Sequence, residues 1–232
     1  MKSGTDQPTR VFYAKASYGR EEIDAVIDVL ENSPLTLMGG PAVGEFENRV
    51  AGLFGKSFGL MVNSGSSANM LAVAALGLRP GDEVITPALT FSTTVAPLVQ
   101  HQLVPVFVDV EADTYNIDVD KIEAMIGPKT RAMMIPNLIG NLPDWARLRE
   151  IADRHHLMLI EDSADTIGSK FRGQPTGRLS DITTTSFYAS HVVTCGGFGG
   201  AVCVDDPELE RRMRLLRGWG RSSSILGESE AP

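Results

Sequence analysis

One histidine stands in the stretch of this chain that best combines reactive side chains with glycines. Residues Thr184–Gly200 read T-T-S-F-Y-A-S-H-V-V-T-C-G-G-F-G-G, and a short β-prone run ending at Ser186 precedes His191. The glycines at 196, 197, 199 and 200 allow a positive φ or a close approach of the backbone to a ligand. Because imidazole exchanges a proton near neutral pH, His191 is a candidate acid or base. Taken by itself, the stretch fits a solvated loop histidine almost as well.

A second stretch has the composition of an anion site. The apolar run Phe58–Val62 leads into N-S-G-S-S-A-N at positions 63–69, and an apolar helical pattern then continues to Leu76. Backbone N–H groups and hydroxyls at the start of a helix after a strand can hold a phosphate. The same residues also fit an ordinary serine cap. No Gly-Lys-Ser/Thr follows, so the stretch is not a P-loop.

Strand and helix patterns alternate along the rest of the chain. We expect helices at 20–32, 41–54, 91–101, 119–126, 144–156 and 207–216, and strands at 83–86, 104–110, 131–136, 157–161, 168–171, 177–186 and 200–204. Alternation of apolar strands with helices is typical of an α/β fold with a mainly parallel, doubly wound sheet. We therefore predict that architecture, with helices on both faces.

Ligands in doubly wound folds bind beyond the carboxyl ends of the strands. Five polar segments follow predicted strands, and they are Ser64–Ser67, Thr90–Phe91, Asn137–Asn141, Asp162–Asp165 and Ser186–His191. We expect them to meet at one rim of the sheet. Their convergence is a stronger indication of a site than any single motif.

Composition limits the classes of function. The chain has 232 residues, 43% of them hydrophobic, and a formal net charge of −8, which argues against general affinity for nucleic acid or anionic lipid. No apolar run approaches a membrane span, and the first ten residues lack an apolar signal core. We expect no membrane association and a cytoplasmic location.

The metal-ligating residue types are sparse. Two cysteines, Cys195 and Cys203, are too few for a disulfide framework or a four-ligand zinc site. His155 and His156 are adjacent, so on a helix they point in directions that cannot share a metal. The sequence predicts no metal centre.

Together these stretches resemble the DegT-type sugar-nucleotide aminotransferases, which are pyridoxal-phosphate enzymes of fold type I. The resemblance runs from about Ala14 to the end. It rests on N-S-G-S-S-A-N at 63–69, P-G-D-E-V-I-T-P at 80–87, P-V-F-V-D-V at 105–110, I-E-D at 160–162 and S-F-x-x-x-H at 186–191. It implies the large, cofactor-binding domain of that fold over residues 1–232, including an N-terminal segment, with the family's smaller C-terminal domain absent from this sequence.

The resemblance also implies roles for seven residues at the rim. Three would hold the cofactor phosphate at a helix start with the hydroxyl of Ser186, namely Gly65, Ser66 and Ser67. Phe91 stands where the family stacks an aromatic ring on the pyridine. Asp162 resembles the carboxylate that pairs with the pyridinium nitrogen, and such a charge keeps the ring protonated as an electron sink. Asp165 occupies the place facing the phenolic oxygen.

The sequence departs from the family at His191. Aminotransferases of this kind carry lysine there, which forms a Schiff base with the cofactor, and imidazole cannot do so. A branch of the family with the same exchange comprises the 3-dehydratases of nucleotide-linked 4-keto-6-deoxyhexoses. The resemblance to that branch, which extends to W-G-R at 219–221 and to Asp165, implies non-covalent pyridoxamine phosphate, His191 as base and loss of the C3 hydroxyl.

Some members of that branch carry a [2Fe–2S] cluster on four cysteines. One of those cysteines would fall near Ala164 and two would fall at Ser222–Ser224, and none is present here. Without thiolates we expect no cluster. The resemblance then implies the cluster-free style, which uses glutamate to regenerate pyridoxamine phosphate. The loop T-C-G-G-F-G-G is also one residue longer than the family's T-x-G-E-G-G and lacks its acid.

The leading hypothesis is therefore a pyridoxamine-phosphate-dependent 3-dehydratase of a nucleotide sugar, acting as a homodimer when complete. One alternative is an aminotransferase relative of altered chemistry. Another is a non-catalytic member that keeps the fold for binding or assembly.

Overall fold

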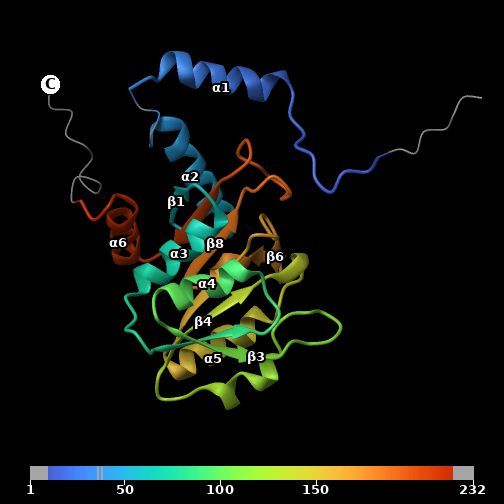
Figure 1. Ribbon diagram of the computed structural model, residues 1–232, viewed down its shortest axis with the longest axis vertical. Helices are drawn as coiled ribbons and strands as arrows, with labels where there is room; N and C mark the ends of the chain where they lie inside the picture. The colour runs from blue at the N-terminus through green and yellow to red at the C-terminus, as the bar shows by residue number, and fades with distance from the viewer. Residues whose placement is uncertain (1–9, 36, 38, 222–232) are drawn as a thin grey trace, which may run out of the picture.

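Within residues 10–35, 37 and 39–221, which the structure describes, seven strands form one central sheet in the computed structural model (Figure 1). The strand order is β1-β9-β8-β5-β4-β2-β3, and β6 pairs with β7 in a separate ribbon. The strands are β1 (Phe58–Val62), β2 (Glu83–Pro87), β3 (Val104–Val108), β4 (Thr130–Pro136), β5 (Met158–Asp162), β6 (Lys170–Phe171), β7 (Gln174–Pro175), β8 (Ile182–Ser186) and β9 (Gly200–Val204).

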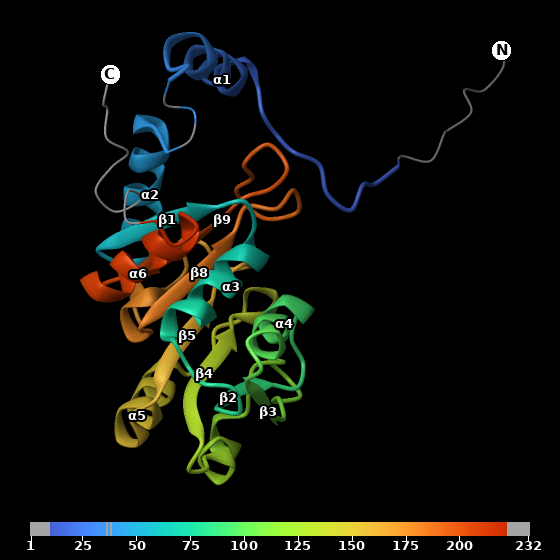
Figure 2. The ribbon, with the colours of Figure 1, turned by 60° about the vertical axis from the view of Figure 1, so that its left-hand side comes forward.

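Helices cover both faces of the sheet (Figure 2). They are α1 (Arg20–Asn32), α2 (Pro41–Phe54), α3 (Gly65–Leu76), α4 (Ser92–Gln100), α5 (Trp145–His155) and α6 (Pro207–Arg217). Helices α3, α4 and α6 share a buried cluster with Ile160 and Ile182 of the sheet. On the other face, α5 packs on Leu159, and α2 packs on Ala201 and Cys203.

The sheet is mainly parallel, as predicted. Strand β5 pairs in parallel with β4 and β8, and β2 pairs in parallel with β3 and β4. Strand β9 runs antiparallel to both of its neighbours, β1 and β8. Strands β1, β8, β5, β4 and β2 therefore end at the same edge of the sheet. The predicted rim exists.

Residues 119–126 do not form the predicted α-helix. They make two 3₁₀ turns, η1 (Val119–Lys121) and η2 (Glu123–Met125). The buried side chains of Val119 and Ile122 are three residues apart, which matches the three residues per turn of a 3₁₀ helix. Gly127 and Pro128 follow, and they leave no room for an α-helix to propagate.

The predicted strand 177–186 is also shorter than expected. Residues Thr176–Leu179 form a 3₁₀ turn (η4), and β8 begins only at Ile182. Gly177 lies so close to α2 that a Cβ there would come within 2.5 Å of the Phe54 carbonyl oxygen. The chain has to pass under α2 at this point before it can enter the sheet.

Helix α1 lies apart from the sheet and from the helices that cover it (Figure 1). It has the predicted bounds, but none of its residues is buried. Its apolar side chains Ile23, Val26 and Leu30 are 40%, 61% and 57% exposed. The amphipathic pattern of this segment therefore forms a helix whose apolar side chains are largely exposed.

None of the helices in the described part of the chain is long and apolar enough to cross a bilayer.

Close packing of α2 against β1 gives a test of the fold. A Cβ at Gly59 would lie 2.3 Å from the Glu47 carbonyl oxygen, so Gly59→Ala should lower the free energy of unfolding by about 1–3 kcal/mol in urea denaturation. Gly52→Ala, at an exposed position of α2, is the control, because nothing lies within 4 Å of its Cβ position. That change should be neutral or should stabilise by up to about 1 kcal/mol. Equal effects of the two changes would contradict this packing.

Candidate functional site

Strand β5 points its last two side chains into different layers. Successive side chains of a strand alternate between the faces of a sheet. Ile160 contributes to the core under α3 and α4, and Leu159 to the core under α5. Asp162 therefore faces α3 and α4, and Glu161 faces α5 and α2.

The Asp162 carboxylate is held by neutral donors from two helices. Its Oδ2 accepts hydrogen bonds from Asn69 Nδ2 at 2.8 Å and from Thr94 Oγ1 at 3.0 Å. Its Oδ1 accepts one longer bond, at 3.3 Å, from the Ala164 backbone N–H. The Asn69 amide is fixed in turn, because its Oδ1 accepts a 2.6 Å bond from Thr184 Oγ1 on β8.

Asp162 is a buried acid with no basic partner among the described residues. The residue is 7% exposed, and no lysine, arginine or histidine of that part of the chain forms an ion pair with it. Burial raises its pKa, while the hydrogen bonds from Asn69 and Thr94 oppose that rise. A buried carboxylate in this setting would be stabilised by a bound cation.

The start of α3, the helix whose Asn69 binds Asp162, provides backbone donors that have no partner within the helix. Ser64 caps the helix, with its Oγ accepting from the Ser67 N–H at 3.1 Å. The N–H groups of Gly65 and Ser66 precede the first intrahelical bond, so they have no partner within the helix. Ser67 Oγ donates to Asn63 Oδ1 at 2.6 Å. This helix also carries Asn69, one turn further along.

The end of β8 lies directly against the start of α3. A Cβ on Gly65 would come within 2.6 Å of Ser186 Cβ and 3.0 Å of Ser186 Oγ. On the other side, a Cβ on Gly200 would meet the Ser64 carbonyl oxygen at 2.3 Å. Glycine at these two positions lets three chain segments meet. The Ser186 hydroxyl consequently stands beside the first N–H groups of α3.

His191 lies at the same rim. Its Nδ1 is 3.4 Å from Asp165 Oδ1, and its side chain is 20% exposed. Tyr188 packs edge-on against the imidazole, with ring centroids 6.2 Å apart. Asp165 also accepts a 3.2 Å bond from the Ile139 N–H. The loop after β8 is thus joined to the loop after β5, three residues beyond Asp162.

Phe91 is the residue that caps α4, and its side chain is 68% exposed. Its carbonyl oxygen accepts a 3.0 Å bond from the N–H of Thr94, the residue whose hydroxyl binds Asp162. The preceding Thr90 has a buried hydroxyl without a hydrogen-bond partner among the described residues. The predicted segment Thr90–Phe91 therefore leads directly into the helix that supplies Thr94 to Asp162.

Asn137 and Asn141, at the ends of a segment predicted to join the rim, have structural contacts instead. Asn137 is 1% exposed, and its side chain binds Glu161, Trp145 and two hydroxyls. Asn141 Nδ2 donates to the Thr114 carbonyl oxygen at 2.9 Å. The Asn137 amide is therefore fully engaged inside the protein, whereas Asn141 is exposed and has one structural bond.

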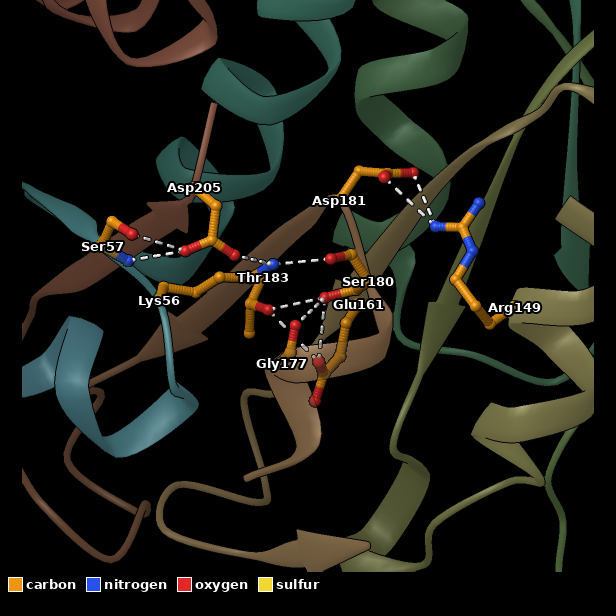
Figure 3. Close-up of polar contacts among 9 residues, drawn as sticks. All are labelled: Lys56, Ser57, Arg149, Glu161, Gly177, Ser180, Asp181, Thr183 and Asp205. Carbon is orange, nitrogen blue, oxygen red and sulfur yellow. Dashed lines mark hydrogen bonds and ion pairs between the residues drawn. The ribbon is translucent and has the colours of Figure 1, made fainter. Parts of the chain in front are cut away.

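Glu161 anchors a second polar cluster, behind the site (Figure 3). Its Oε2 accepts bonds from Ser180 Oγ and Thr183 Oγ1, both at 3.2 Å. The buried Lys56 Nζ donates to the Ser180 carbonyl oxygen at 2.6 Å and pairs with Asp205 at 3.1 Å. This cluster ties β1, β5, β8 and the end of β9 together on the face that Asp162 does not use.

Sequence reasoning missed two residues of the site. Asn69 and Thr94 both bind Asp162, yet neither follows a strand directly. Asn69 is the last residue of the 63–69 motif and a polar residue in an otherwise apolar helical segment. That contrast was the available signal for a buried polar contact. Thr94 lies in a run of small polar residues, S-T-T, that gives no comparable signal.

Known proteins are similar to this chain over most of its length. A family model described as the DegT/DnrJ/EryC1/StrS aminotransferase family matches residues 16–228. The chain is 45% identical to dTDP-4-dehydro-2,6-dideoxy-D-glucose 3-dehydratase of Saccharopolyspora spinosa, over 87% of this chain and 45% of that protein. It is 42% identical to the lipopolysaccharide biosynthesis protein RfbH of Salmonella typhimurium, over 88% of this chain and 48% of that protein.

An aminotransferase is also among the relatives. The chain is 38% identical to dTDP-3-amino-3,4,6-trideoxy-alpha-D-glucose transaminase of Streptomyces venezuelae, over 99% of this chain and 61% of that protein. This chain thus spans about half the length of the curated relatives it matches.

Solved structures show the same fold. The S. venezuelae protein DesV, in complex with a ketimine intermediate, superposes with a TM-score of 0.83 at 38% identity, over 88% of this chain and 54% of that chain. The E. coli GDP-4-keto-6-deoxy-D-mannose-3-dehydratase with bound hydrated pyridoxal phosphate gives 0.80 at 31% identity, over 88% of this chain and 53% of that chain.

The buried charge of Asp162 has a measurable cost. Because burial raises the pKa of Asp162 in the folded state, its contribution to stability is present at acid pH and is lost as the pH rises through the folded-state value. Asp162→Asn should therefore raise the free energy of unfolding at pH 7.5, by about 0.5–2 kcal/mol. The gain should shrink as the pH falls toward about 4.

Urea denaturation across that pH range checks this expectation. Asp113→Asn, at an exposed position, is the matched control and should leave the stability unchanged at every pH. A loss of stability in Asp162→Asn at pH 7.5 would show that the carboxylate is not the strained group inferred here.

Proposed function

Because this chain belongs to the DegT/DnrJ/EryC1/StrS aminotransferase family, whose solved members carry pyridoxal or pyridoxamine phosphate, we propose that it is the cofactor-binding part of a sugar-nucleotide 3-dehydratase. The substrate class is a nucleotide-linked 4-keto-6-deoxyhexose, and pyridoxamine phosphate is the working cofactor. The observation that supports the dehydratase over a transaminase is His191, an imidazole beside Asp165 where the family's aminotransferases have lysine.

The described residues fit this cofactor. Asp162 would pair with the ring nitrogen, since its carboxylate is buried and lacks a basic partner in the described part of the chain. The N–H groups of Gly65 and Ser66 and the hydroxyl of Ser186 would hold the phosphate at the α3 N-terminus. Ser67 would join them by turning its hydroxyl from Asn63 Oδ1 to the phosphate.

Two more residues would contact the ring. Phe91 would cover one face, and Asp165 would face the phenolic oxygen. Their positions at the rim support these roles, Phe91 through the helix that carries Thr94 and Asp165 through its contact with His191.

When bound, pyridoxamine phosphate supplies the amine that engages the 4-keto group and the two electrons that convert the C3–O bond to C3–H. His191 would move the proton. With a proton on Nδ1 facing Asp165, its Nε2 is free to act as the base, and the C3 oxygen leaves as water. Asp162, held by Asn69 and Thr94, would keep the ring nitrogen protonated.

The proposal also covers the amino donor, the oligomeric state and the location of the reaction. Hydrolysis would return the ketone at C4 and release the cofactor's nitrogen as ammonium, and glutamate would then restore the amine form of the cofactor after each turnover. The bare apolar side of α1, with Val26 61% exposed, supports a homodimer in the complete protein. Nucleotide sugars and glutamate are cytoplasmic metabolites, so we place the reaction in the cytoplasm. By analogy with RfbH, the product would enter surface polysaccharide synthesis.

The iron–sulfur style of 3-dehydratase is not part of this proposal. No cluster of three or more histidine, cysteine or acidic residues in the described part of the chain could hold a metal ion. Positions Ser222–Ser224, where two of that style's cysteines would fall, lie outside the described residues. The proposal therefore rests on the sequence at those positions.

An aminotransferase relative is the second candidate, favoured by the 38% identity to the S. venezuelae transaminase. The two reactions differ in product. A dehydratase removes the C3 oxygen and leaves a ketone at C4, whereas a transaminase adds an amine at C4 and retains the oxygen. A binding member without catalysis would leave the sugar unchanged.

Mass spectrometry of the sugar product tests the proposal. With pyridoxamine phosphate, glutamate and a 4-keto-6-deoxy nucleotide sugar, the enzyme should release a product that has lost the C3 oxygen. His191→Asn should lower that rate by about 10²–10⁴-fold, because general acid–base catalysis contributes that much. Pyridoxamine phosphate should still bind, because the residues proposed to hold it are unchanged.

The companion change is His191→Lys. It should let the protein attach pyridoxal phosphate covalently, which borohydride reduction and intact-mass measurement would detect. A 4-amino product with the C3 oxygen retained would favour the transaminase instead. Unchanged sugar together with absent cofactor binding would favour the non-catalytic alternative.

A further inference from the structure

We propose that Asn69 and Thr94 are positioning residues that decide which oxygen of Asp162 meets the cofactor ring and that hold this carboxylate without neutralising it. This inference rests on the proposed function and adds two residues to it. The two carboxylate oxygens of Asp162 are bonded unequally.

A carboxylate oxygen has two acceptor sites. Both sites of Asp162 Oδ2 are filled, by Asn69 Nδ2 at 2.8 Å and Thr94 Oγ1 at 3.0 Å. Oδ1 accepts only the Ala164 N–H, at 3.3 Å, so one of its sites is free. A pyridinium N–H would therefore be directed to Oδ1.

The two donors are themselves rigidly held. The second N–H of Asn69 Nδ2 donates to the Thr93 carbonyl oxygen at 3.1 Å, and Asn69 Oδ1 accepts from Thr184 Oγ1 at 2.6 Å. The amide therefore has only one orientation that satisfies all three contacts. Thr94 and Asn69 are 0% and 3% exposed, so water does not compete for these bonds.

The donors are also uncharged, which matters for the chemistry. An arginine or lysine at either position would fix the carboxylate but neutralise it, and the ring nitrogen would lose its counter-ion. Amide and hydroxyl donors lower the pKa of Asp162 against the rise caused by burial and leave its charge available. Removing one donor should make the carboxylate more basic and draw the shared proton away from the ring.

Binding measurements with two cofactor forms test this. Thr94→Val removes the hydroxyl at nearly constant shape and should weaken binding of pyridoxamine phosphate by about ten-fold, because the lost bond is to a charged group. Asn69→Leu should weaken it at least as much. An analogue with C–H in place of the ring nitrogen should bind to Thr94→Val as it binds to the unchanged protein.

A spectroscopic signature separates positioning from general damage to the site. The ¹⁵N resonance of the ring nitrogen in bound, labelled pyridoxamine phosphate should move toward the unprotonated value in Thr94→Val. Thr94→Ser keeps the hydroxyl, so it should restore both the resonance and the affinity. Circular dichroism would establish that each variant is folded.

The possible results distinguish the positioning role of Asn69 and Thr94 from the proposed function. The positioning role is wrong, and the proposed function stands, if Thr94→Val binds pyridoxamine phosphate as tightly as the unchanged protein does. The same holds if Thr94→Val loses as much affinity for the carbon analogue as for pyridoxamine phosphate. If the unchanged protein binds no pyridoxamine phosphate, both are wrong.

Discussion

A buried negative charge held only by neutral donors is the constraint on which this site depends. Asp162 lies inside the helix layer at the end of β5, and Asn69 and Thr94 bind it without neutralising it. Such a group destabilises the empty protein and stabilises a protein that holds a cation there. The unequal bonding of Asp162 is a sign of binding, because its Oδ1 accepts only one hydrogen bond, whereas each oxygen of the structural acid Glu161 accepts two.

The remaining geometry follows from the sheet. Strand β9 runs antiparallel between β1 and β8, so its first residue, Gly200, lies between the ends of both neighbours. Glycines at 65 and 200 allow the α3 N-terminus, Ser186 and β9 to approach one another to distances that a side chain would forbid. His191 is then brought back over the rim by the loop between β8 and β9, where it meets Asp165.

Much of this could be predicted from the sequence, because apolar periodicity and strand ends are local signals. The order of the helices and strands, and the meeting of Ser186, Asp162 and the α3 start, follow from that pattern. Other features depend on partners distant in the chain. Because Asn137 follows a strand, the sequence predicts it at the rim, yet Trp145 and Glu161 bind it inside the core. The 3₁₀ turns at 119–126 reflect packing that an eight-residue window does not reveal.

Glu161 and Asp162 are consecutive residues whose side chains enter opposite layers, so one peptide plane joins the polar cluster of Lys56 and Ser180 to the ligand side of the sheet. Strand β5 is paired on both sides, with β4 and β8, so the two carboxylates share one backbone whose position the sheet fixes. A replacement at Lys56 that displaced Ser180, and with it Glu161 and β5, would also displace Asp162, and a descendant protein could change its coenzyme pocket without any replacement in the pocket itself.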